Sequence, residues 1–246
     1  MIRYYSTNRH LDGVAGLTPF KGQVSFRDAL IQGQAPDEGL FMPDPIPALS
    51  VGDILALKGA PYAEAALLVA EAFLKDELPR DVLKNIVEDS YNYDVPLEQV
   101  CDRMYVMRLD RGPTASFKDF AARMMARLMS RLRDRGKRLN VLVATSGDTG
   151  SAVGEAFKGV EGIGVWILYP KNEVSGMQKK QLDTIGDNVL ALSVDGKFDD
   201  CQNLVKQAFS DPGFSHLNLT SANSINFGRI MPQSVYYVYA YAQLAK

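Results

Sequence analysis

The sequence predicts an α/β fold with a doubly wound, mainly parallel sheet, preceded by a small, mostly helical N-terminal domain. Two observations carry this prediction: from about residue 105 short apolar runs alternate with helical runs, whereas roughly the first ninety residues show no such alternation. The length of 246 residues also exceeds the usual size of one domain. We therefore expect two units, an N-terminal domain over 1–95 and an α/β domain over 96–246.

In the N-terminal domain, a short extended segment over 2–6 is expected to lead into a helix over 24–31. Ser25 is suited to cap that helix, because its hydroxyl can accept a first-turn N–H, and Asp28 supplies a first-turn acid. A proline-rich turn follows at 43–47. Three more helical stretches complete the domain, two of them opened by a proline that suits a helix start: 50–58, 61–74 and 79–91.

The α/β domain is expected to repeat one pattern, a short apolar strand followed by a helix. The expected strands are 105–109, 139–145, 165–169, 189–194 and 217–220. The expected helices are 118–135, 151–158, 175–185, 198–209 and 230–245. Aromatic side chains of the last helix, from Tyr236 onward, are expected to be partly uncovered. Arginines recur every fourth residue along the first helix, a basic stripe that we interpret as facing solvent or another subunit: Arg123, Arg127, Arg131 and Arg135.

Composition excludes several classes of protein. A net charge of −2 and a pI near 5.8 lack the basic excess of a nucleic-acid binder. No run approaches the ~18 apolar residues of a membrane helix, and the N-terminus lacks an apolar signal segment. Cys101 and Cys201 lie far apart, without a Cys-x-x-Cys motif or a Cys/His cluster, so neither a metal site nor a disulfide framework is expected. A protein of the reducing cytoplasm fits this composition.

One lysine stands out in the segment Arg111-Gly-Pro-Thr-Ala-Ser-Phe-Lys-Asp-Phe120. Lys118 opens the first helix of the α/β domain, where the helix macrodipole and the flanking rings of Phe117 and Phe120 disfavour a charged amine. A neutral amine is what imine chemistry requires. The alternative is an ordinary exposed lysine beside a first-turn acid, Asp119. A second motif favours the chemical interpretation.

The second motif, Thr145-Ser-Gly-Asp-Thr-Gly150, lies between an expected strand and an expected helix. In an open α/β sheet such a loop lies at the carboxyl end of the strands, and its free backbone amides point to a docking anion. Thr145, Ser146 and Thr149 add hydroxyl donors. A simple helix cap at Ser146 or Asp148 would need only one of these residues. The loop matches neither the Walker A motif nor Gly-x-Gly-x-x-Gly, so it does not indicate ATP or NAD.

A third polar segment follows the last expected strand and opens the last helix. It contains Asn223 and Ser224, and Arg229 follows five residues later as a natural fork for phosphate or carboxylate. A polar turn that closes on its own backbone would explain one or two of these residues but not the arginine. We expect this loop to share one edge of the sheet with the Ser146 loop. Two such anion sites facing one lysine imply a substrate with two anionic groups.

These motifs resemble the threonine synthase family, whose members are fold type II pyridoxal-phosphate enzymes. The resemblance covers nearly the whole chain through segments that stand in the family's order: Tyr4-Tyr-Ser-Thr, Val24-Ser-Phe, Asp37-Glu-Gly-Leu-Phe-Met-Pro43, Gly112-Pro-Thr-Ala-Ser-Phe-Lys-Asp, Thr145-Ser-Gly-Asp-Thr-Gly and Asn223-Ser-Ile-Asn-Phe-Gly-Arg. It implies pyridoxal 5'-phosphate as cofactor, with Lys118 as the lysine that carries it and Asp148 near its 3-hydroxyl. It further implies a substrate carboxylate on the Thr145-Ser146-Thr149 loop and a substrate phosphate on Asn223, Ser224 and Arg229.

The activity implied is a carbon-oxygen lyase that converts O-phospho-L-homoserine and water to L-threonine and phosphate, acting as a monomer or a homodimer. Two alternatives stay open: a related phospho-lyase that yields 2-oxobutyrate, and a catalytically incompetent fragment or binding module. The sequence departs from the family in two places. Arg111 stands where many relatives have histidine, and no Ser-Gly-Asn-Phe-Gly cofactor-phosphate loop follows Lys118. We therefore expect an N-terminal portion of such an enzyme that binds the cofactor weakly and turns over no substrate by itself.

Overall fold

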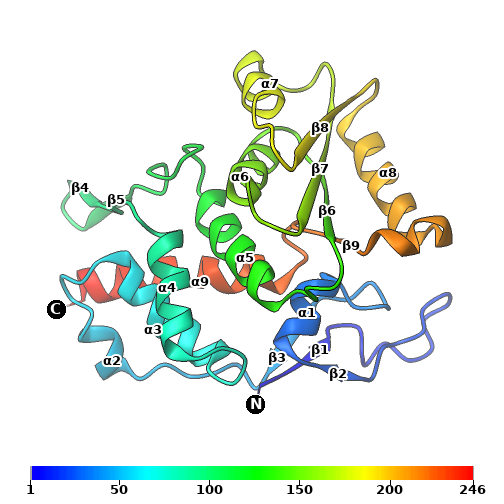
Figure 1. Cartoon of the computed structure of the whole chain (residues 1–246). Coiled ribbons are helices and arrows are strands. Elements are labelled where there is room, and N and C mark those ends of the chain that lie inside the picture. Colours follow the sequence, from blue (N-terminus) through cyan, green and yellow to red (C-terminus); the bar gives the residue numbers. More distant parts are fainter. Residues whose placement is uncertain (1, 246) are drawn as a thin grey trace.

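The computed structural model describes residues 2–245 and confirms the predicted α/β class. A parallel sheet with helices on both of its faces lies above a mostly helical N-terminal part (Figure 1). One continuous hydrophobic core extends from Tyr4 to Val235 and includes residues of both parts. The domain boundary near residue 95 therefore stays a prediction.

The N-terminal part contains the expected helices, at α1 (Phe26–Gln32), α2 (Val51–Leu55), α3 (Tyr62–Leu74) and α4 (Arg80–Ser90). It also contains an antiparallel sheet of order β2-β1-β3, made of β1 (Arg3–Ser6), β2 (Gln23–Val24) and β3 (Phe41–Asp44). The sequence predicted only the first of these strands. β3 is an edge strand, which is where a sheet tolerates its Pro43. The sequence did not indicate this strand, because a proline within a run usually argues against a strand.

The predicted helix starts are confirmed at their capping residues. The Ser25 hydroxyl accepts the backbone N–H of Asp28 at 3.0 Å and so satisfies one free donor at the start of α1. Pro61 and Pro79 directly precede α3 and α4. The starts of these helices are therefore determined by residues next to them in the sequence.

The main sheet has the strand order β8-β7-β6-β9, and all of its pairs are parallel. Its strands are β6 (Leu139–Ala144), β7 (Ile163–Pro170), β8 (Val189–Val194) and β9 (Leu219–Thr220). Helices α5 (Lys118–Leu132), α6 (Asp148–Phe157) and α7 (Gly176–Asp183) cover one face, and α8 (Phe198–Ser210) covers the other (Figure 1). A 3-10 helix over Pro212–Leu217 leads into β9.

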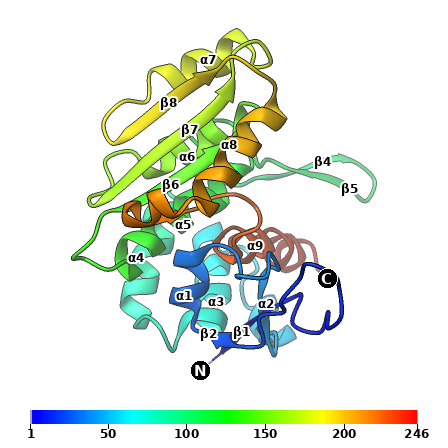
Figure 2. The ribbon, with the colours of Figure 1, turned by 90° about the vertical axis from the view of Figure 1, so that its right-hand side faces the viewer.

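The strand expected over 105–109 does not join the parallel sheet. β5 (Met104–Met107) instead pairs antiparallel with β4 (Leu97–Cys101) in a hairpin that projects from the molecule (Figure 2). The tight turn between them includes Asp102, whose φ of 38° lies in the left-handed region. Pairing with the adjacent strand needs only this turn. An apolar run usually indicates a buried strand, but four apolar residues of this hairpin are exposed: Val100, Met104, Tyr105 and Val106.

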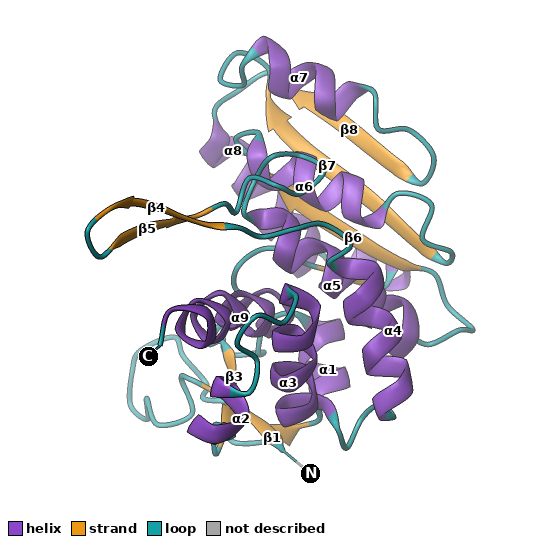
Figure 3. Cartoon of the chain, turned by 90° about the vertical axis from the view of Figure 1, so that its left-hand side faces the viewer, coloured by secondary structure: helices purple, strands orange, loops and turns teal. Residues whose placement is uncertain are grey.

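Helix α9 (Phe227–Leu244) lies between the two parts and packs against α3 and α5 (Figure 3). It starts three residues before the expected residue 230, because the Asn226 side chain accepts the N–H of Gly228 at 2.8 Å and caps the helix there. One face of α9 joins a cluster of edge-packed rings with α3, α4 and α5: Tyr62, Tyr91, Phe120, Tyr236 and Tyr239. The opposite face is partly uncovered as predicted, with Tyr237 77% exposed.

The arginine stripe that begins on α5 has in part a different role from the one predicted: Arg131 and Arg135 are exposed, as expected, but Arg123 and Arg127 are half-buried. Arg123 donates to the carbonyls of Ser90 at 2.7 Å and Asp89 at 2.8 Å, and Arg127 donates to the Asp89 carboxylate at 2.8 Å. These acceptors lie at the C-terminus of α4, where a helix leaves carbonyls unpaired and favours cations. At Arg123 and Arg127 the stripe therefore joins two helices of this chain instead of facing solvent or another subunit.

Within residues 2–245 no helix is long and apolar enough to cross a membrane. The same residues contain no group of three or more histidine, cysteine, aspartate or glutamate side chains arranged to hold a metal ion.

Candidate active site

The loop before α5 is shaped by a buried carboxylate. Asp119 is 1% exposed and accepts hydrogen bonds from the backbone N–H of Thr114 at 2.9 Å and from its hydroxyl at 2.7 Å. Gly112 lies so close that a Cβ there would be 2.5 Å from Asp119 Oδ2. Asp119 is thus not the solvated acid of the simpler sequence interpretation. It fixes the loop that delivers Lys118.

Lys118 lies at the wall of a cavity of about 220 Å³. Its side chain is 21% exposed, and its Nζ lies 3.6 Å from Asp148 Oδ2 and 4.5 Å from the centroid of the Phe117 ring. Of the two rings that the sequence placed around this amine, Phe117 lies beside it, whereas Phe120 packs against Tyr62 and Tyr236, and the structure adds the Asp148 carboxylate. The cavity is lined by Lys118 and its loop together with α6 and α7 residues: Thr114, Ala115, Ser116, Phe117, Asp148, Ser151 and Gln181.

The loop after β6 is held by Thr145. Its buried Oγ1 accepts the N–H groups of Gly147 at 2.9 Å and Gly150 at 2.8 Å, so α6 begins at Asp148, three residues before the expected start. The Thr145 hydroxyl therefore satisfies amides that we expected to face an anion. Ser146 is exposed and Thr149 half-buried, and neither hydroxyl has a hydrogen-bond partner within residues 2–245. These two hydroxyls remain free for a ligand.

Gln178 of α7 was not predicted as part of this site. Its Nε2 donates to Asp148 Oδ1 at 2.7 Å, while its Oε1 accepts the N–H of Ser175 in a capping box. The Ser-x-x-Gln pattern at 175–178 could have revealed the start of α7, but not the contact of Gln178 with Asp148 of α6. The Asp148 carboxylate thus lies between an amide donor and the Lys118 amine.

Gly147 allows this contact. Its φ of 134° is unfavourable for other residues, and a Cβ there would lie 2.4 Å from the Gln178 side-chain amide. We expect Gly147→Ala to destabilise the protein by about 1–3 kcal/mol through backbone strain and overpacking, which lowers the thermal midpoint by roughly 2–4 °C for each kcal/mol.

Thermal unfolding of Gly147→Ala beside a matched control measures this effect. Gly176→Ala is that control, because a Cβ at this α7 position meets no atom within 4 Å. Its midpoint should stay close to that of the original chain. Equal midpoints for the two variants would mean that Gly147 tolerates a side chain and that Gln178 is not held in place as described.

The Asn223 loop shares the expected edge of the sheet with the Ser146 loop, because β9 pairs in parallel with β6. Asn223 is half-buried, and Ser224 is exposed. Asn226 is fully buried and serves the fold, since its Nδ2 donates to the carbonyls of Leu30 at 2.9 Å and Ser221 at 3.0 Å. Asn223 and Ser224 thus lie at the surface of a loop whose backbone is held in place by the Asn226 side chain.

Arg229 does not lie at the open edge, as the sequence suggested, but behind this loop. It is 1% exposed, its Nη1 donates to the Ala222 carbonyl at 2.8 Å, and its Nε is buried without a hydrogen-bond partner. Among the described residues no carboxylate lies within 4.0 Å of the guanidinium. Burial lowers the pKa of Arg229. A buried cation with a free donor and no counter-charge is costly, because neither its charge nor its N–H group is compensated.

Comparison with known proteins agrees with this geometry. Residues 94–243 match the family model for pyridoxal-phosphate dependent enzymes, and residues 3–91 match the model for the threonine synthase N terminus. The chain therefore belongs to the pyridoxal-phosphate dependent enzyme family. Within that family, the chain is similar to threonine synthases. The chain is 43% identical to the threonine synthase of Haemophilus influenzae over 226 residues, which is 91% of this chain and 52% of the relative.

Solved structures give the same result. A PLP-bound threonine synthase from Brucella melitensis matches with a TM-score of 0.88 and 40% identity over 100% of this chain and 52% of that one. The threonine synthase from yeast matches with a TM-score of 0.83 and 32% identity over 98% of this chain and 49% of that one. The resemblance predicted from the motifs is confirmed. The chain spans about half the length of the curated relatives that it matches.

Proposed function

We propose that this chain supplies the catalytic lysine and the substrate loops of a threonine synthase that acts in the cytoplasm on O-phospho-L-homoserine and water to yield L-threonine and phosphate. The observation that carries the proposal is Lys118 at the wall of a cavity, 3.6 Å from Asp148. All of this chain matches about half of a PLP-bound threonine synthase. The match to threonine synthases supports a small-molecule substrate.

The residues around this cavity fit pyridoxal phosphate. A partly exposed lysine amine reaches the cavity, and the wall beside it carries the hydroxyl groups of Thr114, Ser116 and Ser151. When bound, this cofactor supplies an aldehyde carbon for the lysine amine and a ring that withdraws electrons from the Cα of an amino-acid substrate. Lys118 would hold the cofactor, and Asp148 would lie beside it, oriented by Gln178.

Lys118 has two tasks in this proposal. An amine attacks carbon only when it is neutral, so Lys118 must first give up a proton to a base or to water, which ends its ion pair with Asp148. The same amine then moves protons at Cα and Cβ of the substrate. A positioned acid or base of this kind contributes roughly 10²–10⁴ to a rate. Asp119 supports both tasks, because its hydrogen bonds to Thr114 fix the loop from which Lys118 extends.

The two anionic groups of the substrate would bind on separate loops. The free hydroxyls of Ser146 and Thr149, at the start of α6, suit the carboxylate, while Thr145 holds their loop in shape. Asn223, Ser224 and Arg229 suit the phosphate, for which a guanidinium offers two parallel donors. Because Arg229 is buried, its part in binding requires a shift of the loop that contains Ala222.

A chimera tests the proposed activity. Residues 1–246 of this chain replace the matching half of the Haemophilus influenzae threonine synthase, and the product is loaded with pyridoxal phosphate and given O-phospho-L-homoserine. Release of L-threonine with equal phosphate is the expected result. The isolated chain, assayed in parallel, is expected to release neither product.

Other outcomes would contradict parts of the proposal. Formation of 2-oxobutyrate instead of threonine would favour the phospho-lyase. A chimera that folds and takes up cofactor, as its absorption spectrum reports, but releases no product would favour a binding module. Turnover by the isolated chain would mean that these residues suffice for catalysis.

A further inference from the structure

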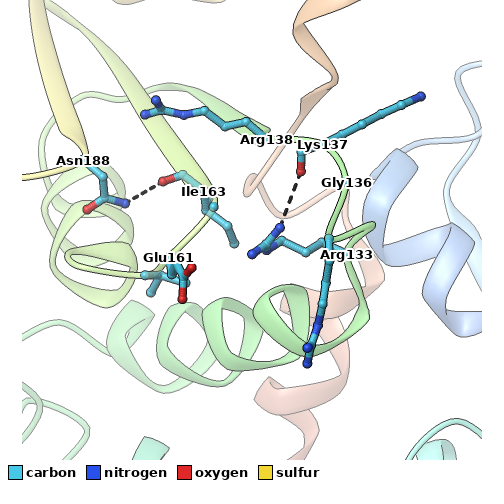
Figure 4. Close-up of a pocket in the computed structure, with 10 residues that line it drawn as sticks. Arg133, Gly136, Lys137, Arg138, Glu161, Ile163 and Asn188 are labelled. Atoms are coloured by element: carbon cyan, nitrogen blue, oxygen red, sulfur yellow. Dashed lines mark hydrogen bonds between the residues drawn. The ribbon is translucent and has the colours of Figure 1, made fainter.

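A second cavity lies at the opposite edge of the main sheet from Lys118, where the parallel strands begin. It has a volume of about 420 Å³, within the range of small-molecule sites. The loop between α5 and β6 forms one side, and the turn between α6 and β7 forms the other (Figure 4). No residue discussed for the Lys118 site contributes to it.

The lining of this cavity is strongly basic. Its charged residues are Glu161 and four cations within one six-residue segment: Arg133, Arg135, Lys137 and Arg138. In residues 2–245, no acidic side chain lies within 4.0 Å of any of the four cations. The chain as a whole has a net charge of −2. The lining therefore concentrates positive charge on a chain whose net charge is negative.

Arg133 is the group best placed for a ligand. Its Nε is buried without a hydrogen-bond partner, and its Nη1 makes only long contacts, 3.3 Å to the Asp134 carbonyl and 3.5 Å to the Lys137 carbonyl. Figure 4 shows its guanidinium directed into the cavity, whereas the Lys137 side chain points away from it. A buried donor without a partner costs free energy until an acceptor arrives.

The opposite wall is built to admit this guanidinium. Gly162 has a φ of 73°, and a Cβ at that position would lie 2.2 Å from Arg133 Nη2. Asn188 fixes the same wall, because its Nδ2 donates to the carbonyls of Phe157 at 2.9 Å and Ile163 at 2.8 Å and its Oδ1 accepts the N–H of Gly159 at 2.7 Å. The cavity is thus formed before any ligand binds.

We propose that this cavity binds a phosphate group, either as inorganic phosphate or as part of a small phosphorylated metabolite, with Arg133 as the principal ligand. A guanidinium presents a planar fork that matches phosphate oxygens, and Arg138 of the same lining adds positive charge that favours a doubly charged anion. A single cavity on a chain of net negative charge does not suit a nucleic acid, which needs an extended basic surface. The site is separate from the proposed active site, so neither depends on the other.

The test titrates the purified chain with inorganic phosphate and, separately, with glucose 6-phosphate as a phosphorylated metabolite, and follows backbone amide signals by NMR. Saturable shifts at Gly136 and Gly162, with little change at Gly147, are expected. Arg133→Gln and, independently, Arg138→Gln should weaken this binding at least tenfold. Arg103→Gln, which removes a 95%-exposed cation from the β4–β5 turn, should not change it.

The two ligands separate the sources of the phosphate group: tighter binding of the sugar phosphate identifies a metabolite site, and equal binding identifies a site for phosphate alone. Retained amide dispersion in the Arg133→Gln and Arg138→Gln spectra shows that the variants are folded. Arg229→Gln should leave the Gly162 shifts unchanged, which separates this site from the proposed substrate site. Shifts that do not saturate, or that fall equally in the Arg103→Gln and Arg133→Gln proteins, would overturn the proposal.

Discussion

Replacing Arg229 by methionine is expected to make the protein more stable and, at the same time, insensitive to a phosphorylated substrate. The guanidinium is buried with one described hydrogen bond, a free Nε and no carboxylate within reach. An apolar side chain of similar length removes the cost of burying this charge, a gain of about 1–4 kcal/mol in the free energy of unfolding. The thermal midpoint should rise by roughly 2–4 °C for each kcal/mol gained.

The functional half of this prediction is measured by ligand-induced stabilisation. O-Phospho-L-homoserine should raise the midpoint of the original chain, because a ligand that binds the folded state stabilises it, and should leave Arg229→Met unchanged. Both proteins carry Arg133→Gln, so that the second cavity does not contribute. Arg127→Met is the matched control: this arginine has the Asp89 carboxylate as partner, and its loss should lower stability. A lower midpoint in Arg229→Met would assign Arg229 a structural role.

Lys118→Ala is expected to abolish specific attachment of pyridoxal phosphate. The cofactor's aldehyde reacts with an amine, and borohydride converts the product to a stable adduct that peptide mass spectrometry locates. Lys118 should carry most of the adduct in the original chain, because it reaches the cavity wall. In Lys118→Ala only the background on exposed lysines should remain.

Lys206→Ala provides the control for that experiment, since this exposed lysine of α8 lies on the other face of the sheet. Its removal should leave the adduct at Lys118 in full. If the principal adduct mapped to a different lysine in the original chain, Lys118 would not be the residue that holds the cofactor.

Local sequence signals predicted most of the fold. Ser25, Pro61 and Pro79 mark helix starts through interactions within a few residues, and β6 and β7 are short apolar runs that the parallel sheet buries. The hairpin over 97–107 was missed because its apolar residues are exposed, so a run of this kind does not indicate which sheet it joins. The family was predicted from the order of the motifs and not from local structure signals. The order is informative because several loops have to contribute residues to one active site.

The candidate site was predicted less completely, because its details depend on contacts between distant residues. Lys118 and Asp148 were both chosen from the sequence, and the structure brings them together. Gln178 was missed, since nothing near it in the chain indicates that its amide reaches Asp148. The burial of Arg229 was also missed: a helix start indicates where the backbone turns, but not whether the side chain ends in solvent or behind a loop.

The position of α9 has a consequence for how the protein folds during synthesis. Residues 227–244 fill the space beside α3, and Gln243 closes the contact through hydrogen bonds with Leu57 at 2.9 Å and Gly59 at 2.9 Å. The ribosome makes α3 about 165 residues before α9, at roughly 5–20 residues per second. The apolar faces of the first helices therefore wait on the order of ten seconds or longer for their partner, and during that interval a chaperone or a neighbouring nascent chain competes for them.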